Sequence, residues 1–263
     1  MDDKKKEKII FFGNGPLAEY ALAILAEKCQ ILFRARERDD LEVVKKLKKD
    51  NPDAHGILAS FGVMIKDDVL EIFEPEGILN IHPSLLPLYR GASPIESAIL
   101  AGDKAFSVSV MKLASGMDAG PIYYQKTLHN LPFCKNDIYK ALAECGAKWI
   151  SDHLTNLPEP VPQDDVKATF TKKLSKTMSK LRPEKRTADE LYRKVVAYQG
   201  FPKPKYEFYG VNCIILEAKV LKNGEKADLV IPCYDGSRLG VYRLQPEGRK
   251  PMDAKAFING YKK

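Results

Sequence analysis

The sequence predicts an α/β protein, with a Rossmann-like, mostly parallel sheet domain followed by a small C-terminal β domain. Through residue 156, short apolar runs alternate with helical patterns, which is typical of βαβ units and a parallel sheet. Beyond a proline-rich stretch, short segments rich in β-forming residues are separated by Gly210, Asn223-Gly224 and Asp235-Gly236. This second pattern is typical of antiparallel strands joined by tight turns.

The elements of the first domain, residues 1–156, follow from periodicity and turn chemistry. The apolar run Lys8–Phe12 has the length of a strand, and Gly13-Asn14-Gly15-Pro16 then turns the chain into a helix. Strands and helices continue to alternate after it. We predict strands over 30–33, 56–60, 78–82, 106–112 and 121–128, and helices over 17–28, 41–49, 67–73, 95–101 and 135–154.

The first turn resembles part of a dinucleotide-binding loop, because Gly13-Asn14-Gly15 follows a strand and precedes a helix. The third glycine of that fingerprint is missing and Pro16 follows directly. A tight strand-to-helix turn therefore explains this stretch better than phosphate binding does.

Residues 157–172 form the predicted linker, because three prolines within five residues exclude a helix and favour an extended spacer. The second domain, 173–263, is expected to begin with a helix over 188–198. Strands are predicted over 205–209, 211–216, 228–231 and 239–243. The pattern predicts a small antiparallel barrel of the oligonucleotide-binding (OB) kind, which often presents a strand face and basic loops to nucleic acid.

The composition is that of a globular protein, with 44% hydrophobic and 29% charged residues in a chain of 263. The apolar run 9–12 is too short for a signal peptide or a membrane span. Five scattered cysteines without C-x-x-C spacing predict reduced thiols and a cytoplasmic protein. The four histidines have no ligand spacing with the cysteines, so we predict no metal site. With no interface signal, we expect a monomer.

Basic residues are concentrated toward the C-terminus. Residues 171–263 hold 21 Lys and Arg against 10 Asp and Glu, whereas the other 170 residues hold 21 against 25. The last third therefore has a net charge of +11 and the rest of the chain −4, which together give the net charge of +7. This distribution predicts either a polyanionic partner or a solvated lysine-rich surface, and charge alone does not distinguish them.

Asn80 and His82 form a candidate catalytic pair at the end of a predicted strand. Alternate side chains of a strand face the same side, and Pro83 favours an extended backbone at His82. Open α/β sheets place their ligand crevice at the carboxyl ends of the strands. An amide can donate to a carbonyl oxygen, and an imidazole can stabilise an oxyanion or move a proton. On its own, Asn-x-His also fits a strand end that merely carries two polar residues.

The residues around this pair resemble the signature of the folate-dependent formyltransferase family. Residues 80–87 read NIHPSLLP, residues 89–91 read YRG, and residues 94–95 read PI. The GMDAG loop of residues 116–120 places Asp118 thirty-six residues after His82, and it looks like the family's catalytic aspartate loop, although alone it fits an ordinary turn. Residues 59–66, ASFGVMIK, are similar to the family's folate-pocket segment.

The resemblance implies the formyltransferase fold, with 10-formyltetrahydrofolate as formyl donor and no metal. Asn80 would hold the formyl oxygen and His82 would stabilise its charge. Asp118 would orient or charge the imidazole and help to remove the proton of the attacking amine. Two segments would grip the folate, and their residues are Phe61, Gly62, Val63 and Ile65 in the first and Ser84, Leu85, Leu86 and Pro87 in the second.

Two further stretches, Lys173-Leu174-Ser175 and the LQPEGRKPM of residues 244–252, are similar to the family members that formylate an aminoacyl-tRNA. They imply that the acceptor is the α-amine of methionine on initiator tRNA, in translation initiation. Family members commonly carry a longer basic loop after the second strand, where this chain has only residues 34–40, and Leu88 stands where a basic residue is common. The candidate phosphate contacts are Arg34, Arg36, Arg38 and Arg90. The first three also fit a solvated surface shared with neighbouring acidic residues.

Three other functions compete with this interpretation. A sugar-nucleotide N-formyltransferase would use the same catalytic residues on an amino sugar, but the basic last third and the LQPEGRK stretch argue against it. A non-catalytic tRNA- or folate-binding relative would not need Asn80, His82 and Asp118 together. A hydrolase of formyltetrahydrofolate would be expected to carry an extra N-terminal domain, and here the first strand begins near residue 8.

Overall fold

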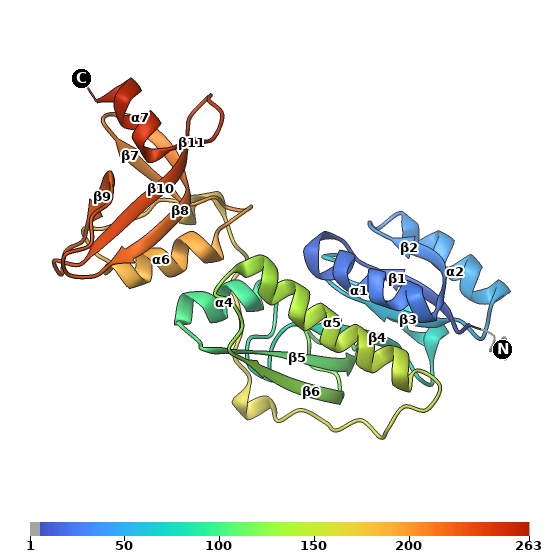
Figure 1. Ribbon diagram of the computed structural model, residues 1–263. Helices are drawn as coiled ribbons and strands as arrows, with labels where there is room; N and C mark the ends of the chain where they lie inside the picture. The colour runs from blue at the N-terminus through green and yellow to red at the C-terminus, as the bar shows by residue number, and fades with distance from the viewer. Residues whose placement is uncertain (1–5, 263) are drawn as a thin grey trace. The chain divides into compact units, whose positions relative to one another are not determined.

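The computed structural model describes residues 6–262, and the chain divides into two compact units. Unit 1 contains Lys104–Lys172 and the chain up to Ile95. Unit 2 contains Glu96–Asp103 and the chain from Lys173 onward. Figure 1 labels the helices and strands of both units in chain order.

Unit 1 is built on a six-stranded sheet in the order β2-β1-β3-β4-β5-β6. The pairings among β1, β2, β3 and β4 are parallel, whereas β4–β5 and β5–β6 are antiparallel. The predicted α/β fold with a mostly parallel sheet is therefore confirmed. The strands are β1 Lys8–Phe12, β2 Gln30–Ala35, β3 His55–Leu58, β4 Ile78–His82, β5 Ala105–Lys112 and β6 Ile122–His129.

Helices connect and cover this sheet. Two of them, α1 and α5, pack against each other, and α5 also contacts β4, β5 and β6 (Figure 1). β4 is buried over its whole length, which explains why its residues other than Asn80 and His82 are all apolar. The helices of unit 1 are α1 Gly15–Lys28, α2 Asp40–Asp50, α3 Asp67–Leu70 and α5 Lys135–His153, with short 3₁₀ helices at Glu71–Phe73 and Asp165–Lys167. A further helix, α4 Pro94–Ala101, begins in unit 1, and its residues from Glu96 onward belong to unit 2.

Gly13 lies where β1 turns into α1, and its lack of a side chain is required there. A Cβ at this position would lie 2.0 Å from the backbone oxygen of Ala59, so any other residue would push two backbone segments apart. The Gly13 N–H donates to the Ala35 oxygen at 2.9 Å. The turn thus joins the ends of three neighbouring strands, and this close packing explains the glycine.

Unit 2 is an antiparallel sheet in the order β11-β10-β8-β7, with β9 paired to β10. The helix α6, Ala188–Ala197, begins at a capping box in which Thr187 and Glu190 exchange hydrogen bonds. The unit's strands are β7 Lys205–Phe208, β8 Val211–Leu221, β9 Leu229–Pro232, β10 Arg238–Pro246 and β11 Met252–Asp253. A last helix, α7 Ala254–Tyr261, was not predicted, and it buries Ala254 and Phe257.

Residues 157–172, the predicted linker, run along unit 1 and bond to it. Val161 and Ile122 exchange two backbone hydrogen bonds of 2.8 Å. Farther along, the Arg90 N–H donates to the Thr169 oxygen at 2.8 Å, and the Thr171 N–H donates to the Arg90 oxygen at 2.7 Å. The segment is therefore held against unit 1 near both of its ends, and the 3₁₀ helix Asp165–Lys167 lies between them. No helix within residues 6–262 is long and apolar enough to cross a membrane.

Candidate active site

A cavity of about 480 Å³ opens in unit 1 beside the carboxyl end of β4. Asn80, His82 and Asp118 all contribute to its wall, together with the segment 61–65. The three proposed catalytic residues therefore converge on one space, although 36 residues separate His82 from Asp118.

Two elements bring these side chains together. Asn80 and His82 are alternate residues of β4, and each is about 5% exposed. Their strand partners on β5 are Met111 and Ser109. Asp118 lies in the loop that joins β5 to β6. This loop leaves β5 beside the start of β4, where Lys112 pairs with Leu79, and it brings Asp118 back to Asn80 and His82. Asp118 has a φ of +47°, in the left-handed region that few non-glycine residues adopt.

The carboxylate of Asp118 is the centre of the arrangement. Its Oδ1 lies 3.6 Å from Nδ1 of His82 and 3.5 Å from Nδ2 of Asn80. Its Oδ2 accepts a hydrogen bond from the Gly91 N–H at 2.7 Å. The carboxylate is therefore fixed on one side by the backbone, and it faces the amide and the imidazole on the other.

The imidazole of His82 has a defined partner for each ring nitrogen. Nε2 lies 3.2 Å from the Tyr89 oxygen, and a carbonyl oxygen can only accept a hydrogen bond. The proton of the neutral ring therefore belongs on Nε2, and Nδ1 faces Asp118 ready to take a second proton. Protonation at Nδ1 would create an imidazolium that the adjacent carboxylate stabilises. This geometry can accept a proton near the cavity and can supply positive charge to it.

The segment 61–65 gives the cavity an apolar wall with backbone polar groups. Phe61 and Ile65 are buried, whereas the Met64 side chain is 58% exposed at the rim. Within residues 6–262, the backbone N–H and C=O groups of 61–65 make no hydrogen bond to another residue. Backbone groups without a partner at the edge of an apolar cavity fit a flat, polar-edged heterocycle such as a pterin.

The predicted second folate segment, Ser84 to Pro87, does not line this cavity, and only the preceding Pro83 does. Ser84 is buried, and its Oγ donates to the Leu88 oxygen at 2.6 Å. Ser109 Oγ on β5 donates to the Ser84 oxygen at 2.7 Å and accepts the Leu86 N–H at 3.1 Å. The loop is thus tied to the sheet behind the catalytic residues. A contact of Ser84, Leu85, Leu86 or Pro87 with folate stays a prediction.

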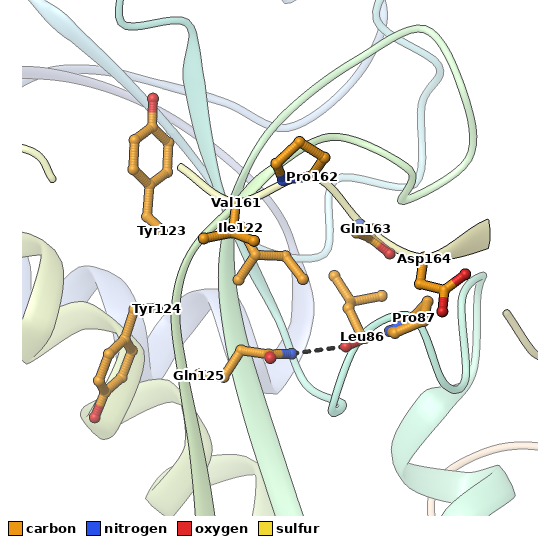
Figure 2. Close-up of a pocket in the computed structure, with 10 residues that line it drawn as sticks. All are labelled: Leu86, Pro87, Ile122, Tyr123, Tyr124, Gln125, Val161, Pro162, Gln163 and Asp164. Carbon is orange, nitrogen blue, oxygen red and sulfur yellow. Dashed lines mark hydrogen bonds between the residues drawn. The ribbon is translucent and has the colours of Figure 1, made fainter. Parts of the chain in front are cut away.

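Leu86 and Pro87 instead line a second cavity of about 390 Å³, between β6 and residues 161–164 (Figure 2). Gln125 spans its floor, and its Nε2 donates to the Leu86 oxygen at 2.8 Å. Burial, followed by a hydrogen bond with Cys145, raises the pKa of Tyr124 to about 12, so this phenol stays neutral. No charged side chain other than Asp164 lines this second cavity among the described residues.

The four arginines predicted to contact phosphates have different surroundings. Arg90 is only 4% exposed, and its guanidinium donates to Gln163 and Asp165. Arg34 donates to Glu19 and to the Gly13 oxygen. The side chains of Arg36 and Arg38 are exposed at the surface of unit 1. Arg36 and Arg38 are therefore better placed to meet a polyanion than Arg34 or Arg90.

One further residue at this site, Gln163, was not indicated by any sequence pattern. Its Nε2 donates to the backbone oxygens of Asp118 at 2.8 Å and Gly120 at 2.7 Å. Because it lies between prolines and aspartates in an apparent spacer, neither periodicity nor a motif indicated a role. Only the folded chain brings Gln163 against the GMDAG loop.

Residues 12–154 match the family model of the formyl transferase domain, and residues 173–262 match that of the formyl transferase C-terminal domain. The methionyl-tRNA formyltransferase of Dictyoglomus turgidum is 31% identical over 247 residues, which cover 86% of this chain and 76% of that protein. That of Thermus thermophilus is 32% identical over 274 residues, which cover 98% and 86%.

Solved structures share the fold. Methionyl-tRNA formyltransferase from Clostridium thermocellum matches with a TM-score of 0.67 at 19% identity, over 94% of this chain and 98% of that one. HypX from Aquifex aeolicus, in complex with tetrahydrofolic acid, matches with a TM-score of 0.75 at 18% identity, over 98% and 48%. A sugar 3N-formyl transferase, WlaRD, matches with a TM-score of 0.62 at 18% identity, over 92% and 98%. At these identities the likeness concerns the fold alone.

Proposed function

The chain belongs to the formyl transferase family, and on that premise we propose that it transfers the formyl group of 10-formyltetrahydrofolate to the α-amine of methionine on initiator tRNA. The observation that carries the proposal is the convergence of Asn80, His82 and Asp118 on one cavity beside the segment 61–65. The reaction would serve translation initiation, so it would take place in the cytoplasm, and we propose a monomer as the working form.

The donor site is the cavity itself. Its volume of about 480 Å³ lies in the range of small-molecule sites, which is roughly 300–1,000 Å³. The backbone groups of 61–65 are available to bind the polar edge of the pterin, and Phe61 and Ile65 hold this segment in the core of unit 1. Formyl transfer of this kind needs no metal, and within residues 6–262 no cluster of His, Cys, Asp and Glu could hold one.

The reaction begins when the uncharged amine attacks the formyl carbon. A C–N bond forms, and the electrons of the C=O bond move to oxygen and give a tetrahedral oxyanion. The oxyanion then collapses, the bond from the formyl carbon to N10 breaks, and N10 leaves with the electron pair. The amine loses one proton and N10 gains one, so formyl-methionyl-tRNA and tetrahydrofolate are formed without any change of oxidation state.

Each of the three residues has a role in this sequence. The Asn80 amide donates to the formyl oxygen, and a charged His82 ring stabilises the oxyanion. Asp118 stabilises that ring charge and provides, with Nδ1 of His82, a place for the amine proton. A single donor to an oxyanion of this kind lowers the barrier by roughly 3–4 kcal/mol.

The acceptor is inferred from the second part of the chain. Residues 171–263 hold 21 basic and 10 acidic residues, which suits a phosphate backbone better than one nucleotide-linked sugar. The relatives with 31% and 32% identity are methionyl-tRNA formyltransferases, which supports the same assignment. Arg36 and Arg38 are candidates for further phosphate contacts from unit 1.

A competition between acceptors tests this proposal. The protein is given 10-formyltetrahydrofolate with either methionyl initiator tRNA or a nucleotide-linked amino sugar, and formylated product is measured. We expect a kcat/KM for the charged tRNA at least a hundredfold above that for the sugar. A preference for the amino sugar would overturn the acceptor and keep the chemistry, and transfer to neither by folded protein would overturn both.

A further inference from the structure

We propose that Gln163 is a positioning residue that holds Asp118 in its reactive orientation. The inference rests on the proposed function, because it adds a residue to the machinery of that reaction. Gln163 lies on segment 157–172, yet its side chain reaches the loop that carries Asp118. Figure 2 shows it between Pro162 and Asp164, on the segment that runs past β6.

The hydrogen bonds of Gln163 fix the orientation of its amide. Nε2 donates to the oxygens of Asp118 and Gly120 at 2.8 and 2.7 Å. Oε1 accepts from Nε and Nη2 of Arg90 at 3.1 and 2.7 Å. A guanidinium can only donate and a carbonyl oxygen can only accept, so the reversed amide would lose all four bonds. Gln163 therefore links the buried Arg90 to the backbone on both sides of Ala119.

The hydrogen bonds from Gln163 act where the loop backbone is least favourable. Asp118 has a φ of +47°, which is unfavourable for a residue with a side chain and persists only where surrounding contacts enforce it. Neighbouring Met117 is 55% exposed, so it contributes little packing. Gln163 bonds to backbone oxygens of the loop, and the Asp118 carboxylate itself has one short hydrogen bond, from the Gly91 N–H at 2.7 Å.

Gln163 is itself held on both sides. Before it, Val161 exchanges two backbone hydrogen bonds with Ile122. After it, Thr169 and Thr171 bond to the backbone of Arg90, and Asp165 accepts from the Arg90 guanidinium at 2.7 Å. Arg90 is thus the common anchor of the segment and of the Gln163 amide. This explains why an arginine that looked suited to phosphate is buried.

The consequence is a specific kinetic effect. If the Asp118 backbone is released, the carboxylate no longer stays close to Nδ1 of His82, and a displacement of about 1 Å can lower a rate about a hundredfold. Folate binding would be unaffected, because Gln163 does not line the donor cavity and does not contact 61–65. Gln163 should therefore influence kcat and leave the KM for the folate donor unchanged.

Two substitutions separate this role from simple packing. Gln163→Met keeps the length of the side chain and removes every hydrogen bond. Gln163→Glu keeps an acceptor for Arg90 but removes both donors to the loop. We expect kcat for formyl transfer to fall about ten- to a hundredfold in both variants, with the KM for 10-formyltetrahydrofolate within about twofold of the original value. Normal kcat in Gln163→Glu would overturn the proposal, because Arg90 would then be the only relevant partner.

Thr127→Val is the matched control. Thr127 is also half-buried in unit 1, and it makes one side-chain hydrogen bond, to Ser107 at 2.9 Å, away from the donor cavity. It should lower thermal stability without changing kcat. A decrease of kcat in this control equal to that in Gln163→Met would mean that general loosening of unit 1 explains the effect, and it would overturn the proposal.

A second measurement does not depend on activity. The Gly91 N–H is held by Asp118 Oδ2, so its hydrogen exchange reports whether the carboxylate is in place. We expect faster exchange of this amide in Gln163→Met and Gln163→Glu, and unchanged exchange in Thr127→Val. Unchanged exchange in all three would overturn the positioning role. If the original protein transferred no formyl group, the proposed function would fail while this measurement still decided the role of Gln163.

Discussion

Nδ1 of His82 lies 3.6 Å from Oδ1 of Asp118, while Nε2 of the same ring lies 3.2 Å from the Tyr89 oxygen. The ring thus has an acceptor on one side and a carboxylate on the other, and the strand β4 fixes its position between them. Asp118 reaches it from the loop that follows β5, which leaves the sheet near the start of β4, where Lys112 pairs with Leu79. This pairing of an imidazole with a carboxylate, beside the Asn80 amide, is what makes the cavity suited to acyl transfer chemistry.

Asp118→Asn should lower kcat strongly and leave the fold intact. The amide can still accept the Gly91 hydrogen bond, but it cannot stabilise a charged His82 ring or take a proton. We expect kcat to fall about a hundredfold or more, as for the loss of a general base. Formyl transfer and thermal unfolding are measured on the same preparation. A kcat within threefold of the original in a folded variant would remove Asp118 from the mechanism.

Asn80→Ala tests the oxyanion donor. The Asn80 side chain is 4% exposed and projects into the cavity from β4, so its removal leaves the formyl oxygen without this donor. Loss of roughly 3–4 kcal/mol of stabilisation corresponds to a decrease in kcat of about a hundredfold or more. Circular dichroism confirms folding, and single-turnover kinetics separate chemistry from product release. A near-normal kcat would show that Asn80 is not the oxyanion donor.

Ser109→Ala should weaken the loop behind the catalytic residues. Ser109 is fully buried and satisfies the Ser84 oxygen, the Leu86 N–H and the Gln125 amide. Alanine would leave buried polar groups without partners, at a cost of roughly 1–3 kcal/mol in the free energy of unfolding. Urea unfolding with an unchanged m value measures this directly. A loss below about 0.5 kcal/mol would mean that the loop does not depend on Ser109.

Arg90→Met should reduce stability rather than tRNA affinity. The guanidinium is buried against Gln163 and Asp165, so it is not available to a phosphate. Tm should fall, and the slope of log Kd for tRNA against log salt should stay unchanged. Loss of a true phosphate contact reduces that slope by about 0.7–0.9. The double variant Arg36→Ala with Arg38→Ala is the comparison for this slope, because both side chains are exposed and are therefore available to phosphates. A reduced slope in Arg90→Met would show that Arg90 does contact a tRNA phosphate.

The sequence predicted the sheet of unit 1 because strands and helices alternate there with clear periodicity. It also indicated Asn80 and His82 as a pair, since the alternation of side chains in a strand is local information. It did not predict α7, although Ala254, Phe257, Ile258 and Tyr261 have helical spacing. Strand β8 also continues to Leu221, beyond the predicted end at residue 216.

The contacts of Arg90 and Gln163 could not be predicted, because 73 residues separate them in the chain. From sequence alone, Arg90 is expected to lie at the surface because it is charged, and Gln163 is expected to belong to a spacer because prolines precede it. Their roles depend on the way segment 157–172 folds back onto unit 1, which is a property of tertiary packing rather than of local sequence. Long-range polar contacts of this kind are where sequence patterns carry least information.

The proposed function is tested most directly by measuring formyl transfer from 10-formyltetrahydrofolate to methionyl initiator tRNA, with methionyl elongator tRNA measured in parallel. We expect one formyl-methionine and one tetrahydrofolate per turnover on the initiator, and little transfer to the elongator. Equal transfer to both would contradict the initiator assignment and leave the chemistry standing. No transfer to either by folded protein would show that the protein is not a formyltransferase acting on methionyl-tRNA.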